Sequence, residues 1–462
     1  MTGRLRVVGI GCDGLDGLTM RAHAVLAGAR RIIGAPRQLE LLDVPADAPS
    51  ADFGAAPTAP DVPAAGSVTA SAAPAITAER VTWPEGYWRR WGEVLADLDP
   101  ATDVILASGD PMFHGIGTTL VRELGAEAIE VFPAPSSASL ACARLGWALD
   151  RTPVVSLVTG PAGREGAGAV VPAADAGRPF LVLCRDADSV AHVADALADR
   201  PGTVLTALTN VGGGETGPCP ESVARGTVAK PPTPAGNLTI LAVEPSGPAR
   251  GWLPDAAFDT DGQLTKSPIR ELTVAALGPR PGALLWDVGG GTGSIAIEWA
   301  RHGGRALCFE RDPERVRRIR ANVAGLSGGV EVVEGSAPEA LTSLDDAHRH
   351  APDAIFIGGG LTAEGMIDAC VAALAPGGRL VANTVTLESE AVLWDARSRF
   401  GGEVQRIGVE RAGKVGSFTA WRPALPVVQW VVDGPSQSKA EGPANANEAR
   451  TARTGAEGEQ HQ

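Results

Sequence analysis

Short apolar runs alternate with helical patterns along most of the chain. Five runs lie in the first half and five in the second, at residues 104–107, 154–157, 180–183, 204–207, 238–241, 284–288, 306–309, 330–333, 354–357 and 379–383. Runs of this length that are rich in aliphatic residues and bounded by Gly, Pro or polar stretches are typical of buried strands. Strands that alternate with helices predict an α/β fold. Residues 403–431 are expected to add closing antiparallel strands.

Two stretches lack the pattern. Residues 44–79 consist mostly of Ala, Pro, Ser, Asp and Gly, and the tail 434–462 is rich in Glu, Ala, Asn, Ser and Gln. Such segments bury too little apolar surface to offset the entropy of ordering, so both are predicted to be disordered. The Pro- and Gly-bearing stretch 244–251 is expected to divide a first domain, residues 1–245, from a second, residues 252–433.

A glycine-rich loop in the second half carries the clearest chemical signal. The strand 284–288 runs into Gly289-Gly290-Gly291-Thr292-Gly293 and then into a helical pattern. Glycines permit a sharp turn and a close approach of backbone N–H groups to a ligand, and the helix offers its positive end. Asp287 is expected to place a carboxylate in the crevice, and Glu310 ends the next strand, where ribose hydroxyls are usually bound. Together these residues predict a cofactor that contains a nucleoside.

The spacing of the glycines favours S-adenosylmethionine (AdoMet) over other cofactors. The loop lacks the wider G-x-G-x-x-G spacing that holds a pyrophosphate, and no Walker Lys-Ser/Thr follows it. A plain strand–helix turn is the alternative. In the first half, Gly9-x-Gly11-x-x-Gly14 matches the NAD pattern formally, but the following strand ends in Gly34 instead of an acid, so NAD binding is rejected. The loop 107–117, with Asp110, exposes backbone donors; its alternative is a surface turn in which Asp110 caps a helix.

Composition narrows the class of ligand. The chain holds 40 basic and 54 acidic residues, a net charge of −14, with no basic stripe, which argues against nucleic acid or an anionic membrane as a partner. No apolar run reaches the length of a membrane span and the N-terminus enters a strand, so a cytoplasmic location is predicted. The six cysteines lie far apart and are expected to be reduced core residues. The scattered histidines suggest no metal site.

The motifs of both halves resemble known families. The first half resembles the tetrapyrrole (corrin/porphyrin) methylases through Gly9-x-Gly11, Ser108-Gly109-Asp110-Pro111, Pro135-Ser136-Ser137 and Gly236-Asn237-Leu238. The second half resembles a class I, Rossmann-like AdoMet methyltransferase through Leu264-Thr265-Lys266, the stretch 287–298 and Ile357-Gly358-Gly359-Gly360-Leu361. The fusion is similar to the family of decarboxylating precorrin-6Y C5,15-methyltransferases of cobalamin synthesis.

The resemblance implies two AdoMet sites and a division of labour. The first half, built of subdomains at about 1–150 and 151–245, would methylate C5 of precorrin-6Y. The second half would methylate C15 and remove the carboxylate of the ring-C acetate, giving precorrin-8. A homo-oligomer is also implied. The cofactor contacts carried over from the family are Gly109, Asp110 and Ser137 in the first half and Thr265, Gly289 to Gly293, Glu310 and Ala337 in the second.

Few catalytic side chains are expected, because methyl transfer to an electron-rich carbon depends mainly on positioning and on exclusion of water. Lys266 and Asn383 are the catalytic candidates. A substrate with many carboxylates predicts basic groups at the cleft mouths, with Lys266, Arg270 and Arg144 as candidates; the alternative for each is an ordinary surface cation. In this chain Ser267-Pro268 replaces the acid that the family usually has after Thr-Lys. A single-site methyltransferase for another acceptor and a non-catalytic AdoMet-binding scaffold are the competing functions.

Overall fold

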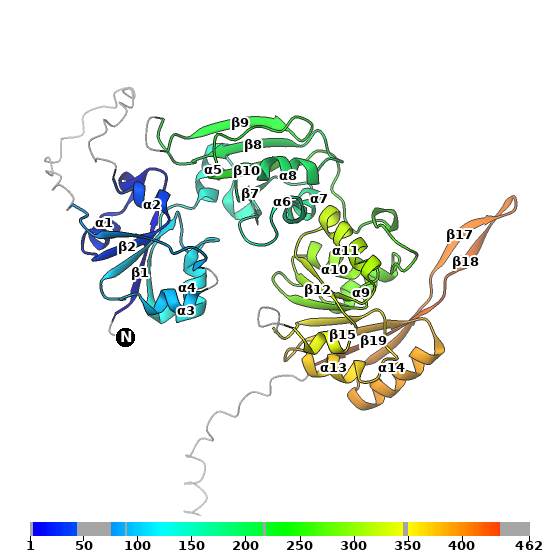
Figure 1. Ribbon diagram of the computed structural model, residues 1–462. Helices are drawn as coiled ribbons and strands as arrows, with labels where there is room; N and C mark the ends of the chain where they lie inside the picture. The colour runs from blue at the N-terminus through cyan, green and yellow to red at the C-terminus, as the bar shows by residue number, and fades with distance from the viewer. Residues whose placement is uncertain (1–2, 44–74, 88–89, 216–218, 345–349, 435–462) are drawn as a thin grey trace, which may run out of the picture. The chain divides into compact units, whose positions relative to one another are not determined.

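The computed structural model describes residues 3–43, 75–87, 90–215, 219–344 and 350–434, and the chain divides into two compact units, Met1–Gly251 and Trp252–Gln462 (Figure 1). The predicted tail 434–462 lies outside the described residues except for Gly434, and so does most of the predicted insertion. Its last residues, 75–79, are described: Ile76 and Ala78 pack against a core cluster and Glu79 begins a strand. The expected insertion is therefore shorter at this end than the composition suggested.

Unit 1 contains two five-stranded sheets. The first is parallel, in the order β3-β2-β4-β1-β5, and the second is mixed, in the order β6-β7-β10-β8-β9. The strands are β1 (Leu5–Ile10), β2 (Arg31–Gly34), β3 (Glu79–Thr82), β4 (Asp103–Ser108), β5 (Ile129–Phe132), β6 (Val154–Ser156), β7 (Phe180–Leu183), β8 (Val204–Thr209), β9 (Ser222–Thr227) and β10 (Thr239–Glu244). The helices are α1 (Met20–Ala27), α2 (Pro36–Glu40), α3 (Trp91–Ala96), α4 (Ile116–Leu124), α5 (Ser137–Leu145), α6 (Gly163–Ala167), α7 (Val171–Asp175) and α8 (Ser189–Ala196).

The burial of these strands explains their sequences. β4, with a strand on each side, is buried from Asp103 to Ala107 and reads as a continuous apolar run, as central parallel strands do. The edge strand β9 has no fully buried position and carries polar residues, which is why it was not predicted. Helix α5 follows the first sheet in sequence, yet its Ala138, Ala141 and Cys142 pack with residues of the second sheet.

Unit 2 is built on one seven-stranded sheet in the order β13-β12-β11-β14-β15-β19-β16, with β19 antiparallel to both of its neighbours. The strands are β11 (Leu284–Val288), β12 (Arg305–Glu310), β13 (Val330–Glu334), β14 (Ala354–Ile357), β15 (Arg379–Thr384), β16 (Glu403–Ile407), β17 (Glu410–Val415), β18 (Phe418–Pro423) and β19 (Val427–Asp433). The helices are α9 (Ile269–Leu277), α10 (Ser294–Arg301), α11 (Pro313–Leu326), α12 (Glu339–Thr342), α13 (Met366–Ala373) and α14 (Leu387–Phe400).

Helices cover both faces of this sheet. Alternate residues of β11 belong to different core clusters: Leu285 packs with α9, α10 and α11, whereas Trp286 and Val288 pack with α12, α13 and α14. Local signals start the helices where the sequence suggests; for α11, Asp312 accepts hydrogen bonds from the backbone of Glu314 and Arg315 ahead of the helix. The α/β class and the Rossmann-like second domain are thus confirmed. Of the closing strands, β16 and β19 join the sheet as predicted, whereas β17 and β18 form a separate hairpin.

The strand order decides where a ligand can bind. The chain leaves β11 for β12 on one side of the sheet, and β14 lies on the other side of β11, so the order reverses between β11 and β14. Loops that follow adjacent strands part at such a point and leave a crevice at the carboxyl ends of the strands.

Candidate active site

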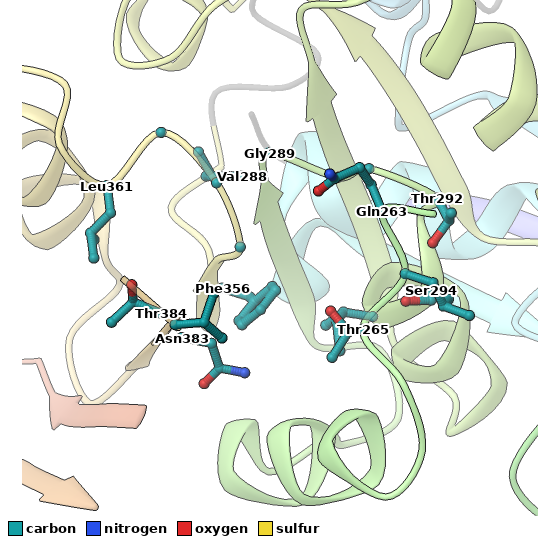
Figure 2. A pocket seen from close by; sticks show the side chains of 18 of the residues that line it. Gln263, Thr265, Val288, Gly289, Thr292, Ser294, Phe356, Leu361, Asn383 and Thr384 are labelled. Atoms are coloured by element: carbon teal, nitrogen blue, oxygen red, sulfur yellow. The ribbon is translucent and has the colours of Figure 1, made fainter. Parts of the chain in front are cut away.

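A cavity of about 900 Å³ lies at this crevice in unit 2. This is at the upper end of the usual size range for small-molecule sites. Figure 2 shows two sides of the cavity, with Gln263, Thr265, Thr292 and Ser294 on one and Leu361, Asn383 and Thr384 on the other. The structure brings most of the predicted site residues of unit 2 to this cavity, namely Thr265, Lys266, Gly289, Gly290, Gly291, Thr292, Glu310, Ala337 and Asn383.

The glycine loop packs too tightly for side chains. Gly289 has a φ of 77°, and a Cβ added there would lie 2.7 Å from the backbone nitrogen of Gly359, so the loops after β11 and β14 touch through their backbones. A Cβ on Gly290 would lie 2.3 Å from the Cys308 sulfur. The glycines therefore serve both the turn and the close packing of two loops, which leaves the space above them open for a ligand.

Glu310 fastens this loop from the tip of β12. One carboxylate oxygen accepts a hydrogen bond from the backbone N–H of Gly291 at 2.9 Å, and the other accepts from the N–H groups of Arg311 at 2.9 Å and Asp312 at 3.0 Å. A carboxylate offers about four acceptor positions, so Glu310 keeps capacity for a hydroxyl donor in the cavity that it lines. Nearby, the buried Thr292 hydroxyl has no hydrogen-bond partner among the residues that the structure describes. Both groups fit a ribose-bearing ligand.

Asp287 does not line the cavity, contrary to the expectation from sequence. Its side chain is 1% exposed, and one oxygen accepts a hydrogen bond from the backbone N–H of Ala296, near the start of α10, at 3.1 Å. Burial raises the pKa of Asp287 to about 7, and the nearby negative charge of Glu310 adds to the rise while the Ala296 hydrogen bond opposes it. Asp287 therefore stabilises the glycine loop from its buried side and does not face the cavity. Gly293 also lies off the cavity, at the N-cap of α10.

Arg270 is neither a substrate-binding group at the cleft mouth nor a surface cation. Its side chain is 0% exposed, and one guanidinium nitrogen donates to the Asp255 carboxylate and to the Thr265 carbonyl, both at 2.9 Å. Another nitrogen donates to the Leu253 carbonyl, and the guanidinium carbon lies 4.8 Å from the centre of the Phe258 ring. These partners all belong to residues 253–267, which we call the entry strap. Arg270 holds the entry strap in place.

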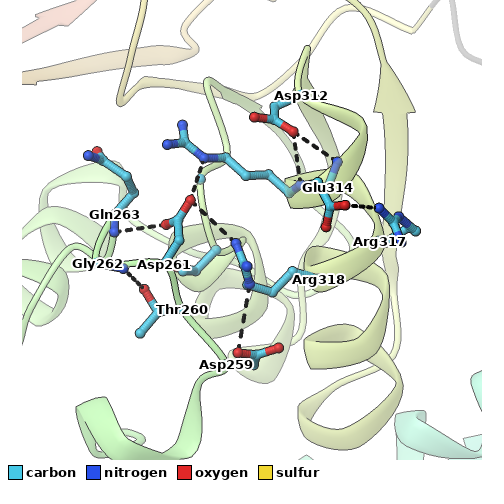
Figure 3. Close-up of polar contacts among 12 residues, drawn as sticks. Asp259, Thr260, Asp261, Gly262, Gln263, Asp312, Glu314, Arg317 and Arg318 are labelled. Atoms are coloured by element: carbon cyan, nitrogen blue, oxygen red, sulfur yellow. Dashed lines mark hydrogen bonds and ion pairs between the residues drawn. The ribbon is translucent and has the colours of Figure 1, made fainter.

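A second set of contacts ties the entry strap to α11 (Figure 3). The Asp261 carboxylate pairs with Arg315 at 2.9 Å and with Arg318 at 3.3 Å, and it accepts a hydrogen bond from the backbone N–H of Gln263 at 3.1 Å. The Gln263 carbonyl in turn lies 3.0 Å from the position of a Cβ on Gly291, so the strap passes directly over the glycine loop. These residues were missed because the strap has no periodic pattern that would mark it as part of the site.

Further cations line the cavity. Lys266 is exposed and makes no ion pair with any residue that the structure describes. Arg311, after β12, and Arg411, on the β17–β18 hairpin, also line the cavity, and Arg411 donates to the Ser267 carbonyl. Both arginines were missed because the topology, rather than sequence proximity, brings them to the same cavity as Lys266. The cavity thus carries uncommitted positive charge in a chain with a net charge of −14.

In unit 1 the predicted residues lie on two touching loops. A Cβ on Gly109, which has a φ of 58°, would lie 3.1 Å from the Pro135 carbonyl, so the loop after β4 meets the segment that leads into α5, where Ser137 is the first residue. The Asp110 carboxylate accepts a hydrogen bond from the backbone N–H of Met112 at 2.9 Å and so stabilises its own turn. The structure therefore brings Gly109, Asp110 and Ser137 together at the carboxyl end of β4.

Arg144 is committed to a protein partner. Its guanidinium donates two hydrogen bonds to Glu221, at 2.8 and 3.0 Å, and Glu221 also accepts from the Gly212 N–H at 2.9 Å. Arg144 lowers the pKa of Glu221 below its usual value. This paired geometry argues against the predicted role of Arg144 in binding substrate carboxylates.

The remaining composition-based expectations concern thiols, metals and membranes. All six cysteines are free, and all except Cys219 are buried, as predicted. Within the described ranges no group of three or more His, Cys, Asp or Glu side chains could hold a metal ion. No helix in the described part of the chain is both long and apolar enough to cross a membrane.

Comparison with known proteins defines the class of the molecule. Residues 4–229 match the family of tetrapyrrole (corrin/porphyrin) methylases, and residues 256–434 match the precorrin methyltransferase domain. The chain is thus a two-domain tetrapyrrole methyltransferase.

Individual relatives narrow the class to one family. The decarboxylating precorrin-6Y C(5,15)-methyltransferase of Mycobacterium tuberculosis (strain CDC 1551 / Oshkosh) is 42% identical over 434 residues, which cover 92% of this chain and 98% of that protein. A probable decarboxylating cobalt-precorrin-6B C(15)-methyltransferase of Pyrobaculum calidifontis is 34% identical over 185 residues, 38% of this chain and 92% of that protein. The solved C-terminal domain of precorrin-6Y C5,15-methyltransferase from Rhodobacter capsulatus is 45% identical and covers 39% of this chain and 96% of that chain, with a TM-score of 0.36. The chain belongs to the family of decarboxylating precorrin-6Y C5,15-methyltransferases.

Proposed function

We propose that this protein methylates precorrin-6Y at C5 and C15 and removes the carboxylate of the ring-C acetate, giving precorrin-8, with AdoMet as the methyl donor in both units. Unit 1 is assigned the C5 methylation, and unit 2 the C15 methylation and the decarboxylation. The observation that carries the proposal is the match to a relative of that name along 92% of the chain and 98% of the relative's length. The division of labour is supported by the Pyrobaculum calidifontis protein, which is named for the C15 step and matches over 185 residues, close to the length of the precorrin methyltransferase domain at residues 256–434.

The residues of unit 2 suit AdoMet. Glu310 has acceptor capacity for ribose hydroxyls, the glycine loop offers backbone N–H groups, and Thr265, Thr292 and Ala337 lie around it. AdoMet would supply an electrophilic methyl group on a sulfonium. The entry strap is held in place by Arg270 and Asp261 and passes over the glycine loop, and we assign to it the positioning of the acceptor carbon for in-line approach.

Recognition of the macrocycle is assigned to the cations of the cavity. Lys266, Arg311 and Arg411 can bind peripheral carboxylates that the reaction leaves intact, because attraction between opposite charges is strong in a partly enclosed site. Because Lys266 lines the cavity together with these arginines, we assign it to substrate binding rather than to a catalytic role.

The proposal is tested by incubating the full chain with precorrin-6Y and methyl-labelled AdoMet. The expected product gains two methyl groups and loses carbon dioxide, as read by mass spectrometry; no gain of methyl groups would refute the proposal. A Gly291→Val variant should stop at a product methylated only at C5, because its side chain would meet the Gln263 carbonyl at a residue with a φ of 60°. Addition of a Gly109→Val variant, impaired in unit 1, should complete that reaction. Methylation at C15 by the Gly291→Val variant alone would contradict the division of labour.

The competing functions differ in the number of bound cofactors and in turnover. A single-site methyltransferase for another acceptor binds one AdoMet per chain, whereas the proposal requires two, which calorimetric titration counts. A non-catalytic scaffold would bind AdoMet without turnover. The homo-oligomer and the cytoplasmic location stay predictions; light scattering of the full chain and cell fractionation test them.

A further inference from the structure

A chain of hydrogen bonds passes through Asn383, on the wall of the cavity. The Asn383 amide nitrogen donates to the hydroxyl of Thr273 on α9 at 2.8 Å. The Asn383 amide oxygen accepts from the side chain of Gln429 on β19 at 3.0 Å, and Gln429 accepts from Gln405 on β16 at 2.8 Å. Thr273 and Gln429 are fully buried, so their bonds to Asn383 are shielded from competing water, whereas Gln405 is exposed.

The direction of every bond in this chain follows from one carbonyl group. The Thr273 hydroxyl donates its single hydrogen to the Ile269 carbonyl at 2.7 Å, because a carbonyl can only accept. Thr273 must therefore accept from Asn383, which turns the Asn383 amide nitrogen toward α9 and its oxygen toward Gln429. Gln429 then presents its nitrogen to Asn383 and its oxygen to Gln405. The orientation of the Asn383 amide is thus determined by the fold.

This orientation leaves Asn383 with one free hydrogen-bond donor within the described part of the chain. Its oxygen and one N–H are engaged, and the second N–H has no partner among the residues that the structure describes. Asn383 lines the cavity on the side opposite Thr292 and Ser294, beside Thr384 (Figure 2). All the side chains that hydrogen bond to Asn383 are neutral. The fold therefore holds a neutral hydrogen-bond donor on the side of the cavity away from the glycine loop.

We propose that Asn383 binds the ring-C acetate carboxylate that is lost as carbon dioxide, and that Thr273 and Gln429 are positioning residues for its amide. This inference rests on the proposed function of unit 2. In the step, the bond between the acetate methylene and its carboxylate breaks and the electron pair passes into the conjugated imine system of the macrocycle. Carbon dioxide departs, and a proton from solvent converts the remaining methylene to a methyl group.

A neutral donor suits this step better than a cation does. The carboxylate loses its charge as carbon dioxide forms, so a Lys or Arg beside it would stabilise the starting state more than the transition state and would slow the reaction. A single amide N–H can hold the carboxylate in place and stabilises the charged starting state less than a Lys or Arg would. On this view the cavity uses Lys266, Arg311 and Arg411 for the carboxylates that stay and Asn383 for the one that leaves.

The test uses the full chain with substrate labelled in the acetate carboxyl group, and it measures the rate of carbon dioxide release at substrate concentrations well below KM, where the rate reports kcat/KM. Asn383→Ala and the nearly isosteric Asn383→Asp remove the donor and should slow release by about tenfold or more, the usual effect of a hydrogen bond to a charged group. Thr273→Val removes the acceptor that orients Asn383 and should slow release by several-fold, whereas Thr273→Ser, which restores the hydroxyl, should return it to the wild-type rate. Affinity for AdoMet in unit 2 and methylation at C5 should stay unchanged.

The possible outcomes separate this inference from the proposed function. A wild-type chain that neither adds methyl groups nor releases carbon dioxide refutes the proposed function. A wild-type chain that does both, with Asn383 variants that release carbon dioxide within about twofold of it, refutes the inference alone. Variants that lose AdoMet binding in parallel with carbon dioxide release assign Asn383 a structural role and also refute it. Equal rates in the Thr273→Val and Thr273→Ser variants refute the positioning role of Thr273.

Discussion

Replacement of Asp287 by Asn should change how the stability of unit 2 depends on pH. Asp287 is almost fully buried, and this burial is the largest cause of the rise of its pKa from 3.8 to about 7. Because the folded state binds the proton more tightly than the unfolded chain, the associated stability is present below the unfolded pKa and is lost as pH rises through the folded pKa. A shift of this size corresponds to about 4 kcal/mol, since each pKa unit is worth about 1.4 kcal/mol. Asn keeps the shape and the hydrogen bond from Ala296 and does not titrate.

The expected result is a difference that grows with pH. Relative to wild type, Asp287→Asn should gain up to about 4 kcal/mol in the free energy of opening between about pH 4 and about pH 8. Hydrogen exchange of the β11 and β12 amides measures this quantity within the full chain, after correction for the intrinsic exchange rate at each pH. Titrating groups that do not interact with Asp287 cancel because they are common to both proteins. A difference that stays constant over this range would refute the reasoning, since Asp287 would then titrate alike in both states.

Three further predictions concern the cavity and the entry strap. Gly289→Ala should abolish AdoMet binding in unit 2, as measured by calorimetry. The control is Gly365→Ala, because Gly365 has a similar φ of 75° but a Cβ added there would have no atom within 4 Å. The control should lose only about 1 kcal/mol of stability and keep AdoMet binding. Arg270→Met should destabilise unit 2 by about 3–5 kcal/mol in thermal unfolding, because it leaves buried polar partners without their cation, and should weaken AdoMet binding by loosening the strap. Glu310→Ala should weaken AdoMet binding about tenfold or more, whereas Glu334→Ala, at the paired position of β13 but off the cavity, should not.

Each of these has a clear contrary result. Equal loss of binding from the substitutions at Gly289 and Gly365 would mean that backbone strain, not the contact between the two loops, decides the site. A stability loss below about 1 kcal/mol at Arg270 would indicate an exposed ion pair instead of a buried one. Unchanged AdoMet affinity without the Glu310 carboxylate would remove the argument for a ribose contact.

The sequence alone determined the class of fold and the centre of the site in unit 2. Strands such as β4, β11 and β14 were predictable because each is a short buried run whose apolar character is a local property. The glycine loop and Glu310 were predictable for a related reason. They end consecutive parallel strands, and the carboxyl ends of such strands share one edge of the sheet.

Only the tertiary structure decided what the charged and amide side chains do. Arginine is usually a surface residue, and nothing in the sequence indicates otherwise for Arg270 or Arg144. The fold buries Arg270 under the entry strap and pairs Arg144 with Glu221, which is 77 positions away. Asn383 is oriented by Thr273 and Gln429, which lie 110 and 46 positions from it. An apolar residue carries its preference for the core wherever it stands, whereas a polar side chain acquires its function from the partners that the folded chain places beside it.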